Sequence, residues 1–487
     1  MEETTVYLFE EFLNIEDKYN FFDIEINSIK IWQYIRFIYC SKLLEELTGI
    51  LTANKRPHIK QEEDKIDKNE WIKKHQFLLR KKDLLVINHP RRVKEGNYYR
   101  CYVTDTFLES LDCSYYVFEY AYGGKHLKPV KTHALRYRDV SVIKKYLPYK
   151  DDKLQADVRK FTDRVNGIFE KELNIKLSNK MKRYVAAEVN NSLIGIYYGR
   201  IYANIILSLI RPKAVITTVG YELYNQILIE TAKKKKIPTI ELEHGRIGDT
   251  HAAYNFKSKR NLDTFSDYLF VYGEYERNKP RYPIDRSNVF AVGYPELERK
   301  AKTYQRKTKK KRNYKIISFI SSPHDGKAIS RYAIELSKRI KGKAIKIVYK
   351  LHPSEYGDWK KYYPGLEESG IHIVNENEHD IYYYISRSDY IVGITSTVLY
   401  EAMQFETEII VIKELDFTES EIVYNCGRAM LASDFEDMCR IIENNIKHDK
   451  CEESNYFTPN ALPNMKRVLN DILKTPVNKK KIKKEVM

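Results

Sequence analysis

The sequence predicts an α/β protein built from two doubly wound parallel sheets. Three observations support this fold class: short apolar runs alternate with helical segments, the alternation stops at one basic stretch, and it then begins again. Strands that alternate with helices form parallel sheets with helices on both faces. With 487 residues, the chain is long enough for two or three domains with separate cores.

The first part of the chain begins with a helical extension. Residues 1–80 carry apolar residues at the three-to-four spacing of amphipathic helices. Residues 151–210 form a second long helical stretch, and residues 221–235 a shorter helix. The short apolar runs predict strands at 83–88, 113–120, 212–218, 238–243, 267–273 and 288–293.

The segment 299–313 is basic and poor in apolar residues, which indicates a linker. Beyond it the strands are predicted at 315–321, 344–351, 371–375, 389–394 and 408–413, with helices near 327–340, 379–386 and 397–404. The predicted domains are 1–310 (with the extension 1–80), 311–455, a helix within 456–475 that returns to the first domain, and a basic tail at 476–487.

Composition indicates a folded protein with anionic partners. An apolar fraction of 43% and a charged fraction of 31% exclude wholesale disorder. The 84 basic and 67 acidic residues give a net charge of +17, which favours nucleotide phosphates, lipid headgroups, acidic glycans or nucleic acid as partners. No helix-turn-helix, zinc-finger or RNA-binding signature is present, so nucleic acid is not expected.

We expect a cytoplasmic location. The six cysteines are scattered, with no CxxC pair and no zinc-ligand spacing, which argues against a disulfide framework. The first residues lack the pattern of a signal peptide, and no segment approaches the ~20 apolar residues that cross a bilayer. The lysine-rich tail predicts peripheral contact with an anionic membrane surface, although such tails also serve only as solubilising termini.

Polar side chains follow neighbouring strands in the second half of the chain. They are Lys350, His352 and Pro353 after 344–351, Thr395, Ser396 and Thr397 after 389–394, and Ser321 and Ser322 after 315–321. Ligands bind at the carboxyl ends of parallel strands, and a helix that opens with hydroxyl residues offers backbone amides to phosphate. The sequence therefore predicts a nucleotide phosphate site here.

Each of these residues also has a structural alternative. His352 can donate a charge-assisted hydrogen bond to phosphate, or it can lie in a solvated turn where Pro353 ends the strand. Lys350 lies on the same side of the sheet as His352 if strand geometry persists. Ser396 or Thr397 can cap the following helix as well as bind phosphate. Ser321 and Ser322 form either a phosphate loop or an ordinary loop with a cap.

The first half carries a candidate catalytic base. Glu243, His244, Gly245 and Arg246 end the strand 238–243. Attack by a hydroxyl group requires a base, and both carboxylate and imidazole serve. Adjacent side chains on a strand point in opposite directions, so only one faces a ligand. His244 has the better starting pKa, near ~6.5, whereas the basicity of Glu243 would need adjustment by burial; a loop histidine bonded to backbone is the alternative.

Three arginines are candidates for binding an anionic acceptor. Arg91 and Arg92 follow the first strand, after His89 and Pro90, and Arg246 follows His244. Acceptor binding is slightly favoured over the alternative that Arg91 and Arg92 are solvated surface charges. Asp249 and His251 extend the loop after His244 as weaker catalytic candidates.

Two α/β sheets joined by a linker predict the GT-B architecture. The motifs Glu243-His244-Gly245, His352-Pro353 and Ser396-Thr397, in this order, resemble those of bacterial GT-B enzymes that build capsule, lipopolysaccharide and teichoic acid. The similar groups are capsular Kdo transferases, bacterial sialyl- and polysialyltransferases and CDP-glycerol polymerases. The resemblance covers about residues 210–415 and leaves out the helical extension and the tail.

The resemblance implies an inverting glycosyltransferase that needs no metal and no cofactor. Its donor would be a nucleotide-sugar, CMP-linked by preference, and its acceptor a cell-surface polysaccharide or lipid-linked glycan. His352, Ser396 and Thr397 would hold the departing phosphate, and Glu401 would hold ribose or sugar hydroxyls unless it is an ordinary surface charge. A CDP-glycerol or CDP-ribitol polyol-phosphate transferase and a nucleotide-sugar 2-epimerase are the alternatives on the same fold.

Overall fold

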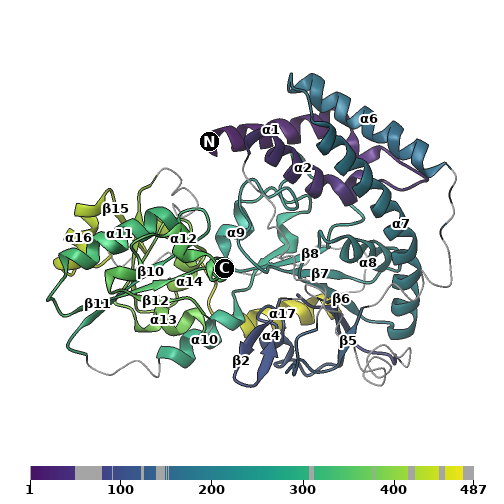
Figure 1. Ribbon diagram of the computed structural model, residues 1–487. Helices are drawn as coiled ribbons and strands as arrows, with labels where there is room; N and C mark the ends of the chain where they lie inside the picture. The colour runs from purple at the N-terminus through teal and green to yellow at the C-terminus, as the bar shows by residue number, and fades with distance from the viewer. Residues whose placement is uncertain are drawn as a thin grey trace. The chain divides into compact units, whose positions relative to one another are not determined.

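The computed structural model describes residues 2–49, 79–89, 91–121, 126–138, 149, 151, 153–305, 312–376, 379–414, 423–448 and 456–474. The chain divides into two compact units (Figure 1). Unit 1 comprises Met1–Gly293 and Asn460–Met487, and unit 2 comprises Tyr294–Pro459. Each unit contains one parallel sheet and is described by itself.

The sheet of unit 1 has the order β5-β4-β1-β6-β7-β8-β9, and every neighbouring pair is parallel. Its strands are β1 (Leu84–Ile87), β4 (Tyr115–Glu119), β5 (Leu135–Tyr137), β6 (Ala214–Thr217), β7 (Thr239–Leu242), β8 (Tyr268–Val271) and β9 (Val289–Ala291). Strands β1, β6 and β7 are buried along their whole length, as expected of a sheet covered on both faces. The strand order reverses between β1 and β6, which makes this the ligand-binding switch point of the fold.

Helices cover both faces of this sheet. One core is formed with α1 (Glu2–Lys18), α2 (Trp32–Thr48), α6 (Leu154–Glu172), α7 (Asn179–Ile210) and α8 (Leu223–Lys234). The other face packs against α4 (Asp105–Leu108) and α17 (Ala461–Lys474). Figure 1 shows α17, in yellow, beside the blue strands of unit 1. Short elements complete the unit: η1 (Phe21–Asp23), the hairpin β2 (Val93–Glu95)–β3 (Tyr98–Arg100), α9 (Glu274–Asn278) and η2 (Arg286–Asn288).

The expectation that no segment is long and apolar enough to cross a bilayer is wrong for α7, the one helix among the described residues that meets this length and hydropathy. Half of its apolar window is buried within the protein, because α7 packs on α2, α6 and α8. This is the environment of a core helix. Its first turn is capped by Ser178, whose side chain accepts a hydrogen bond from the backbone N–H of Met181.

Unit 2 has the strand order β12-β11-β10-β13-β14-β15, again fully parallel. In chain order this is 3-2-1-4-5-6, the order of a Rossmann sheet, with its switch point between β10 and β13. The strands are β10 (Lys315–Ile320), β11 (Ile345–Lys350), β12 (His372–Val374), β13 (Tyr390–Gly393), β14 (Glu408–Ile412) and β15 (Met430–Ala432). The helices are α10 (Pro295–Gln305), α11 (Gly326–Arg339), η3 (Pro353–Glu355), α12 (Trp359–Tyr362), η4 (Glu367–Ser369), α13 (Ile381–Arg387), α14 (Val398–Ala402) and α16 (Phe435–Glu443).

The predicted fold class is confirmed as an α/β protein with two Rossmann-like domains and helices at the N-terminus. All the predicted strands are present, within two residues at each end. The sequence missed β2, β3, β5 and β15, which are three residues long and therefore give little periodicity. The predicted extension beyond residue 49 and the basic tail lie outside the described residues.

The boundary between the units differs from the predicted one. It lies at Gly293, which adopts a φ of 95° that strongly favours glycine. The predicted linker 299–313 is helical in its first part, because α10 extends to Gln305 and packs on α13. Lys300 and Tyr304 of α10 both bond to Asp380, which anchors the helix to unit 2.

Candidate functional site

The carboxyl ends of β10 and β13 are joined by one carboxylate at the switch point of unit 2. Asp325 accepts hydrogen bonds from the backbone N–H of Thr395 at 2.9 Å and from its hydroxyl at 2.7 Å. Its other oxygen accepts from the backbone N–H of Ser322 at 3.2 Å. The hydroxyls of Ser322 and Thr395 lie 3.2 Å apart. This arrangement fixes the two loops against each other at the edge where a Rossmann sheet binds its ligand.

A second carboxylate joins β10 to the loop after β11. Glu355 is buried in η3 and accepts the backbone N–H of His352 at 2.7 Å and the hydroxyl of Ser321 at 3.1 Å. The Tyr363 hydroxyl also donates to Glu355. His352 and Glu355 form a capping box around Pro353, so the turn after β11 is rigid.

His352 itself is exposed at this edge, and its Nδ1 lies 2.7 Å from the Ser354 hydroxyl. His352 and Ser396 follow β11 and β13, which are separated by β10. Two strand spacings put the strand ends about 10 Å apart on the same edge of one sheet. The hydrogen bonds of Glu355 and Asp325 link both loops to adjacent residues, Ser321 and Ser322, and so form one support across the switch point.

The hydroxyl cluster after β13 divides into supporting and accessible residues. Thr395 is held by Asp325 through both its N–H and its hydroxyl, which gives it a structural role beside the predicted contact with phosphate. Ser396 accepts from the N–H of Val398 at 3.3 Å, as a cap does. Thr397 is exposed. The helix that follows, Val398–Ala402, is shorter than predicted. The polar groups at the carboxyl end of β13 are therefore mainly side-chain hydroxyls and not the amino terminus of a long helix.

Lys350 does not lie beside His352 as predicted. Strand β11 ends at Lys350, so the alternation of the strand does not continue to His352. The Lys350 side chain is buried, and its Nζ donates to the Leu351 carbonyl at 2.9 Å and to the Tyr356 hydroxyl at 2.5 Å. Burial lowers the pKa of Lys350 to about 8, while Glu355 opposes this shift. Lys350 therefore supports the turn.

Glu401 lies on α14 and bonds to the Tyr382 hydroxyl. Burial raises the pKa of Glu401 to about 7, and the nearby Asp380 adds to the shift, although the Tyr382 bond opposes it. A carboxyl group that titrates near neutral pH can both donate and accept a proton. Glu401 is therefore more than an ordinary surface charge.

Two histidine rings meet at the switch point of unit 1. His89 follows β1 and His244 follows β7, and their rings stack over the intervening β6 with centroids 5.6 Å apart. The Tyr221 hydroxyl, from the loop after β6, lies 3.3 Å from Nε2 of His244. Tyr102 contacts the His89 ring, with centroids 5.7 Å apart. Aromatic side chains from three strand ends thus form one surface.

These histidines are uncharged at neutral pH. Burial lowers the pKa of His244 to about 3, and His89, His251 and Arg91 add to the shift, whereas the backbone of Thr218 opposes it. Burial likewise lowers the pKa of His89 and of His251 to about 4. His244 is consequently always available as a proton acceptor, but it is a weaker base than its ordinary pKa predicts.

Glu243 does not fit the role of catalytic carboxylate. Its side chain is buried and accepts from the backbone N–H of Tyr272 at 2.6 Å. Burial, with a smaller effect from Glu276, raises the pKa of Glu243 well above its ordinary value. Glu243 therefore holds its proton and is buried in the interior, where it cannot serve as an exposed base for an acceptor.

The three predicted acceptor arginines have different environments. Arg92 is buried and forms ion pairs with Glu119 at 2.5 Å and Asp105 at 3.9 Å, so it is a structural residue and the acceptor role predicted for it is wrong. Arg91 is exposed next to the stacked histidines, and its N–H donates to His89 Nδ1 at 3.1 Å. Arg246 is half-buried in the loop after β7.

The N-terminal helices hold the loop that carries His251. Arg36 of α2 is buried, pairs with Glu16 of α1 at 2.6 Å, and donates to the carbonyls of Ala252 and Asn255. Its guanidinium lies 4.1 Å from the ring centroid of Phe256. The extension thus positions the loop that continues from His244, which gives it a direct structural role in the candidate site.

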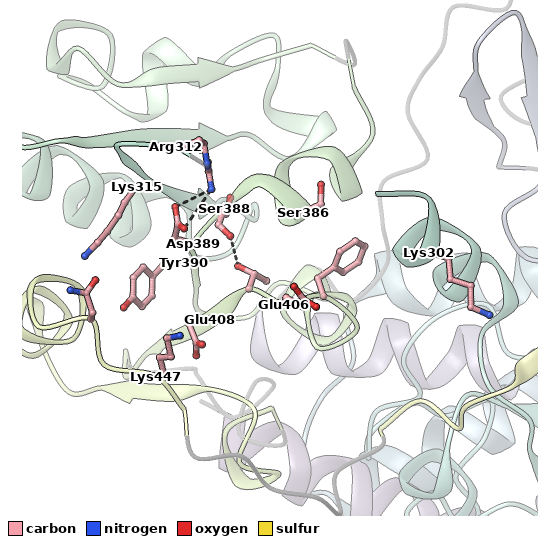
Figure 2. Close-up of a pocket in the computed structure, with 13 residues that line it drawn as sticks. Lys302, Arg312, Lys315, Ser386, Ser388, Asp389, Tyr390, Glu406, Glu408 and Lys447 are labelled. Carbon is pink, nitrogen blue, oxygen red and sulfur yellow. Dashed lines mark hydrogen bonds and ion pairs between the residues drawn. The ribbon is translucent and has the colours of Figure 1, made fainter. Parts of the chain in front are cut away.

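A cavity of unit 2 lies away from these strand ends. Figure 2 shows this open cavity of about 790 Å³ near Lys315, Asp389 and Glu408, at the amino-terminal ends of β10, β13 and β14. Arg312 bonds to Asp389 within it. It is at the sheet edge opposite to His352 and Ser396, so its size does not identify the ligand site of the fold.

Several site residues escaped the sequence interpretation. Asp325 was part of the loop SSPHDG without a role, and Glu355 forms a capping box three residues after His352, a spacing that could have revealed it. Nothing in the sequence identifies Tyr221 as a site residue except its position after a predicted strand. Among the described residues, no group of histidine, cysteine and acidic side chains is arranged to hold a metal ion.

No family model matches the chain, and no curated protein is significantly similar in sequence. Among solved structures, the chain is similar to the UDP-GlcNAc 2-epimerase from Methanocaldococcus jannaschii, with a TM-score of 0.47 and 13% identity over 80% of this chain and 99% of that chain. The enzyme from Neisseria meningitidis bound to UDP-GlcNAc gives a TM-score of 0.47 and 14% identity, over 80% and 98% of the two chains. A variant of the wall teichoic acid polymerase TagF gives 0.40 and 10%, over 75% and 80%.

Proposed function

We propose that this protein is an inverting, metal-independent glycosyltransferase that moves a sugar from a nucleotide-activated donor, CMP-linked by preference, to a cell-surface polysaccharide or glycolipid acceptor. The observation that supports this most is the rigid edge at the switch point of unit 2, where Asp325 and Glu355 hold the loops after β10, β11 and β13. That edge presents His352, Ser396 and Thr397, and no cofactor is required.

Unit 2 would bind the donor nucleotide. When the bond between the anomeric carbon and the phosphate oxygen breaks, negative charge grows on the phosphate. The imidazole of His352 and the hydroxyls of Ser396 and Thr397 would stabilise that charge by donating hydrogen bonds. Ser321 and Ser322 would act through support of this edge, because Ser321 is bonded to Glu355 and Ser322 faces Thr395.

Unit 1 would bind the acceptor. His244, uncharged and beside Tyr221, would accept the proton of the acceptor hydroxyl as its oxygen attacks the anomeric carbon. Because the low pKa makes the imidazolium a strong acid, the proton would pass on to solvent readily. Arg91, exposed beside His89, would bind an anionic acceptor, and Arg246 would assist it.

Glu401 favours one alternative. A nucleotide-sugar 2-epimerase needs carboxyl groups that exchange protons with the sugar ring, and the pKa of Glu401, near 7, suits such a role. A CDP-glycerol or CDP-ribitol polyol-phosphate transferase would use the same edge of unit 2 with a different transferred group. Product analysis separates the three: a released nucleotide and a glycan, a released nucleotide and a phosphate-containing polymer, or an isomerised nucleotide-sugar.

The test is a thermal-shift screen of CMP, CDP, UDP, GDP and ADP with the wild type, His352→Ala and the control His372→Ala. His372 is exposed on β12 of the same sheet. His372→Ala therefore removes the same imidazole group, but from a position outside the proposed donor site. A nucleotide at about 100 times its Kd stabilises a protein by ~2.7 kcal/mol. We expect a cytidine nucleotide to raise the Tm of wild type and His372→Ala only. Indifference to all five nucleotides would contradict the proposal.

We also propose that the protein acts in the cytoplasm, with contact to the inner face of the plasma membrane, where lipid-linked acceptors are assembled. The basic tail predicted for this contact lies outside the described residues.

A further inference from the structure

The carboxyl-terminal half of α7 exposes apolar side chains on one face. Tyr197, Ile205 and Leu209 are 40%, 38% and 39% exposed; the half-buried Ile194 precedes them, and the half-buried Ile201 lies between Tyr197 and Ile205. Successive members are three or four positions apart, so they lie along one side of the helix. We call Ile194, Tyr197, Ile201, Ile205 and Leu209 the apolar stripe. In Figure 1, α7 lies on the outer side of unit 1.

Basic residues gather at the end of the apolar stripe. Arg211 follows α7 directly, and Lys235, from the end of α8, reaches the Ser208 hydroxyl at 3.5 Å. Lys236 follows Lys235, and the backbone of Lys82 bonds to the Ile210 carbonyl, which brings Lys81 alongside. We call the exposed residues Lys81, Arg211, Lys235 and Lys236 the basic cluster.

Within the described part of the chain, no residue of the basic cluster forms an ion pair with an acidic side chain. Asp83 is paired with Lys213 at 2.8 Å. Glu230 is paired with Arg200 and Lys234 at 2.6 Å and 2.7 Å. These two carboxylates are therefore paired with cations outside the basic cluster, which leaves the cluster positively charged as far as the described residues go.

We propose that the apolar stripe and the basic cluster together dock this protein on an anionic lipid bilayer. Aliphatic side chains enter the acyl boundary, tyrosine suits the headgroup level, and lysine and arginine attract acidic headgroups. A protein partner fits less well, because the centres of protein interfaces are depleted of lysine. The proposal concerns unit 1 alone and does not depend on which reaction the protein catalyses.

The test is co-sedimentation of the full chain with vesicles of phosphatidylcholine alone and of phosphatidylcholine containing about one third phosphatidylglycerol. We expect the wild type to bind the anionic vesicles only. Ile205→Asp/Leu209→Asp should weaken binding by about tenfold or more, because it places charge in the apolar stripe. Lys235→Gln/Lys236→Gln should weaken it about fivefold for each lysine removed.

Matched controls change similar residues in unit 2. Tyr362→Asp alters a side chain that is 47% exposed, and Lys338→Gln/Lys341→Gln removes two exposed lysines. Neither should affect vesicle binding. Circular dichroism and the nucleotide thermal shift show whether each variant is folded, and they report on the donor site independently of the membrane result.

Removal of residues 477–487 separates the apolar stripe from the lysine-rich tail. The truncated chain should still bind vesicles in a manner sensitive to Ile205→Asp/Leu209→Asp. The proposal is overturned if the wild type binds neither vesicle, or if binding is lost with the tail and unaffected by the other variants. It is also overturned if the stripe variants change only the oligomeric state in solution.

Discussion

The imidazole rings of His89 and His244 stack with their centroids 5.6 Å apart and their planes 27° from parallel. They come from strands that are not neighbours, since β6 lies between β1 and β7. Burial is the main cause that lowers the pKa of His244, and the His89 ring adds to the shift, because two cations at this distance would repel. The switch point of unit 1 therefore presents an uncharged aromatic surface within a chain of net charge +17.

Replacing His244 tests its role as proton acceptor. We expect His244→Gln to lower the transfer rate by about 10²- to 10⁴-fold, the usual contribution of a general base. Stabilisation by nucleotide should be unchanged, because the donor contacts proposed for unit 2 are intact. His372→Gln is the control. Equal activity of His244→Gln and wild type would exclude the proposed base.

Glu241 should make stability depend on pH. Burial raises its pKa from 4.5 to about 7, while Tyr254 and the Gly220 N–H, which bond to it, oppose the shift. Because the pKa of Glu241 is higher in the folded protein than in the unfolded chain, its protonated form contributes to the free energy of unfolding. This contribution is fully present below pH 4.5 and is lost as the pH rises through 7. The loss is roughly 1.4 kcal/mol per pH unit within that window.

Glu241→Gln removes this titration and keeps an oxygen acceptor. The lowered pKa values of His89, His244 and His251 change stability in the opposite direction. The stability that these neutral histidines contribute is lost as the pH falls below ~6.5. The test is therefore the difference between variant and wild type in urea unfolding at pH 5 and pH 8. The variant should gain stability relative to wild type at the higher pH; a constant difference would contradict the assignment.

Asp325 should support both the stability and the ligand site of unit 2. Asp325→Ala leaves the N–H groups of Ser322 and Thr395 without their acceptor, which costs about 1–3 kcal/mol for each buried group left unsatisfied. We expect lower urea midpoints and weaker nucleotide binding. Asp325→Asn keeps one oxygen acceptor and should be intermediate. If Asp325→Ala binds nucleotide with unchanged affinity, the hydrogen bonds of Asp325 stabilise the fold but do not support the ligand site.

Gly326 should not tolerate a side chain. A Cβ there would lie 2.1 Å from the Tyr363 hydroxyl and 2.8 Å from the Ser321 hydroxyl, the two groups that bond to Glu355. Gly326→Ala should destabilise unit 2 by about 1–3 kcal/mol. Gly167→Ala, in α6, meets nothing within 4 Å and should be neutral or stabilising by up to ~1 kcal/mol. Thermal unfolding of both variants distinguishes crowding from a general intolerance of glycine replacement.

The sequence predicted the two sheets because buried parallel strands are continuous apolar runs, readable without knowledge of their partners. It also placed His244, His352 and Ser396 at strand ends, where the structure has them. Periodicity could not reveal which polar residues support others. In the sequence, Arg92 and Lys350 cannot be distinguished from basic residues on the surface. Only their partners in the structure, Glu119 for Arg92 and Tyr356 for Lys350, show that they are buried.

The direction of the pKa shifts was also beyond the sequence. Glu243 and His244 are adjacent, yet burial gives the carboxyl a proton and denies one to the imidazole. That outcome depends on how deeply each side chain is buried and on residues far away in the chain, such as Arg36, which holds the loop that continues from His244. The local sequence pattern reveals neither the burial of a side chain nor the distant residues that pack against its loop.

Helix α17 has a consequence for synthesis of the protein. Met465, Val468, Leu469 and Ile472 complete the same core as Leu84 and Val86, although the whole of unit 2 is translated between them. A ribosome must therefore release residues up to the end of α17 before unit 1 can bury that face of its sheet, whereas unit 2 is contiguous and can fold earlier. Nascent chains arrested before residue 461 should accordingly expose an incomplete first unit to chaperones.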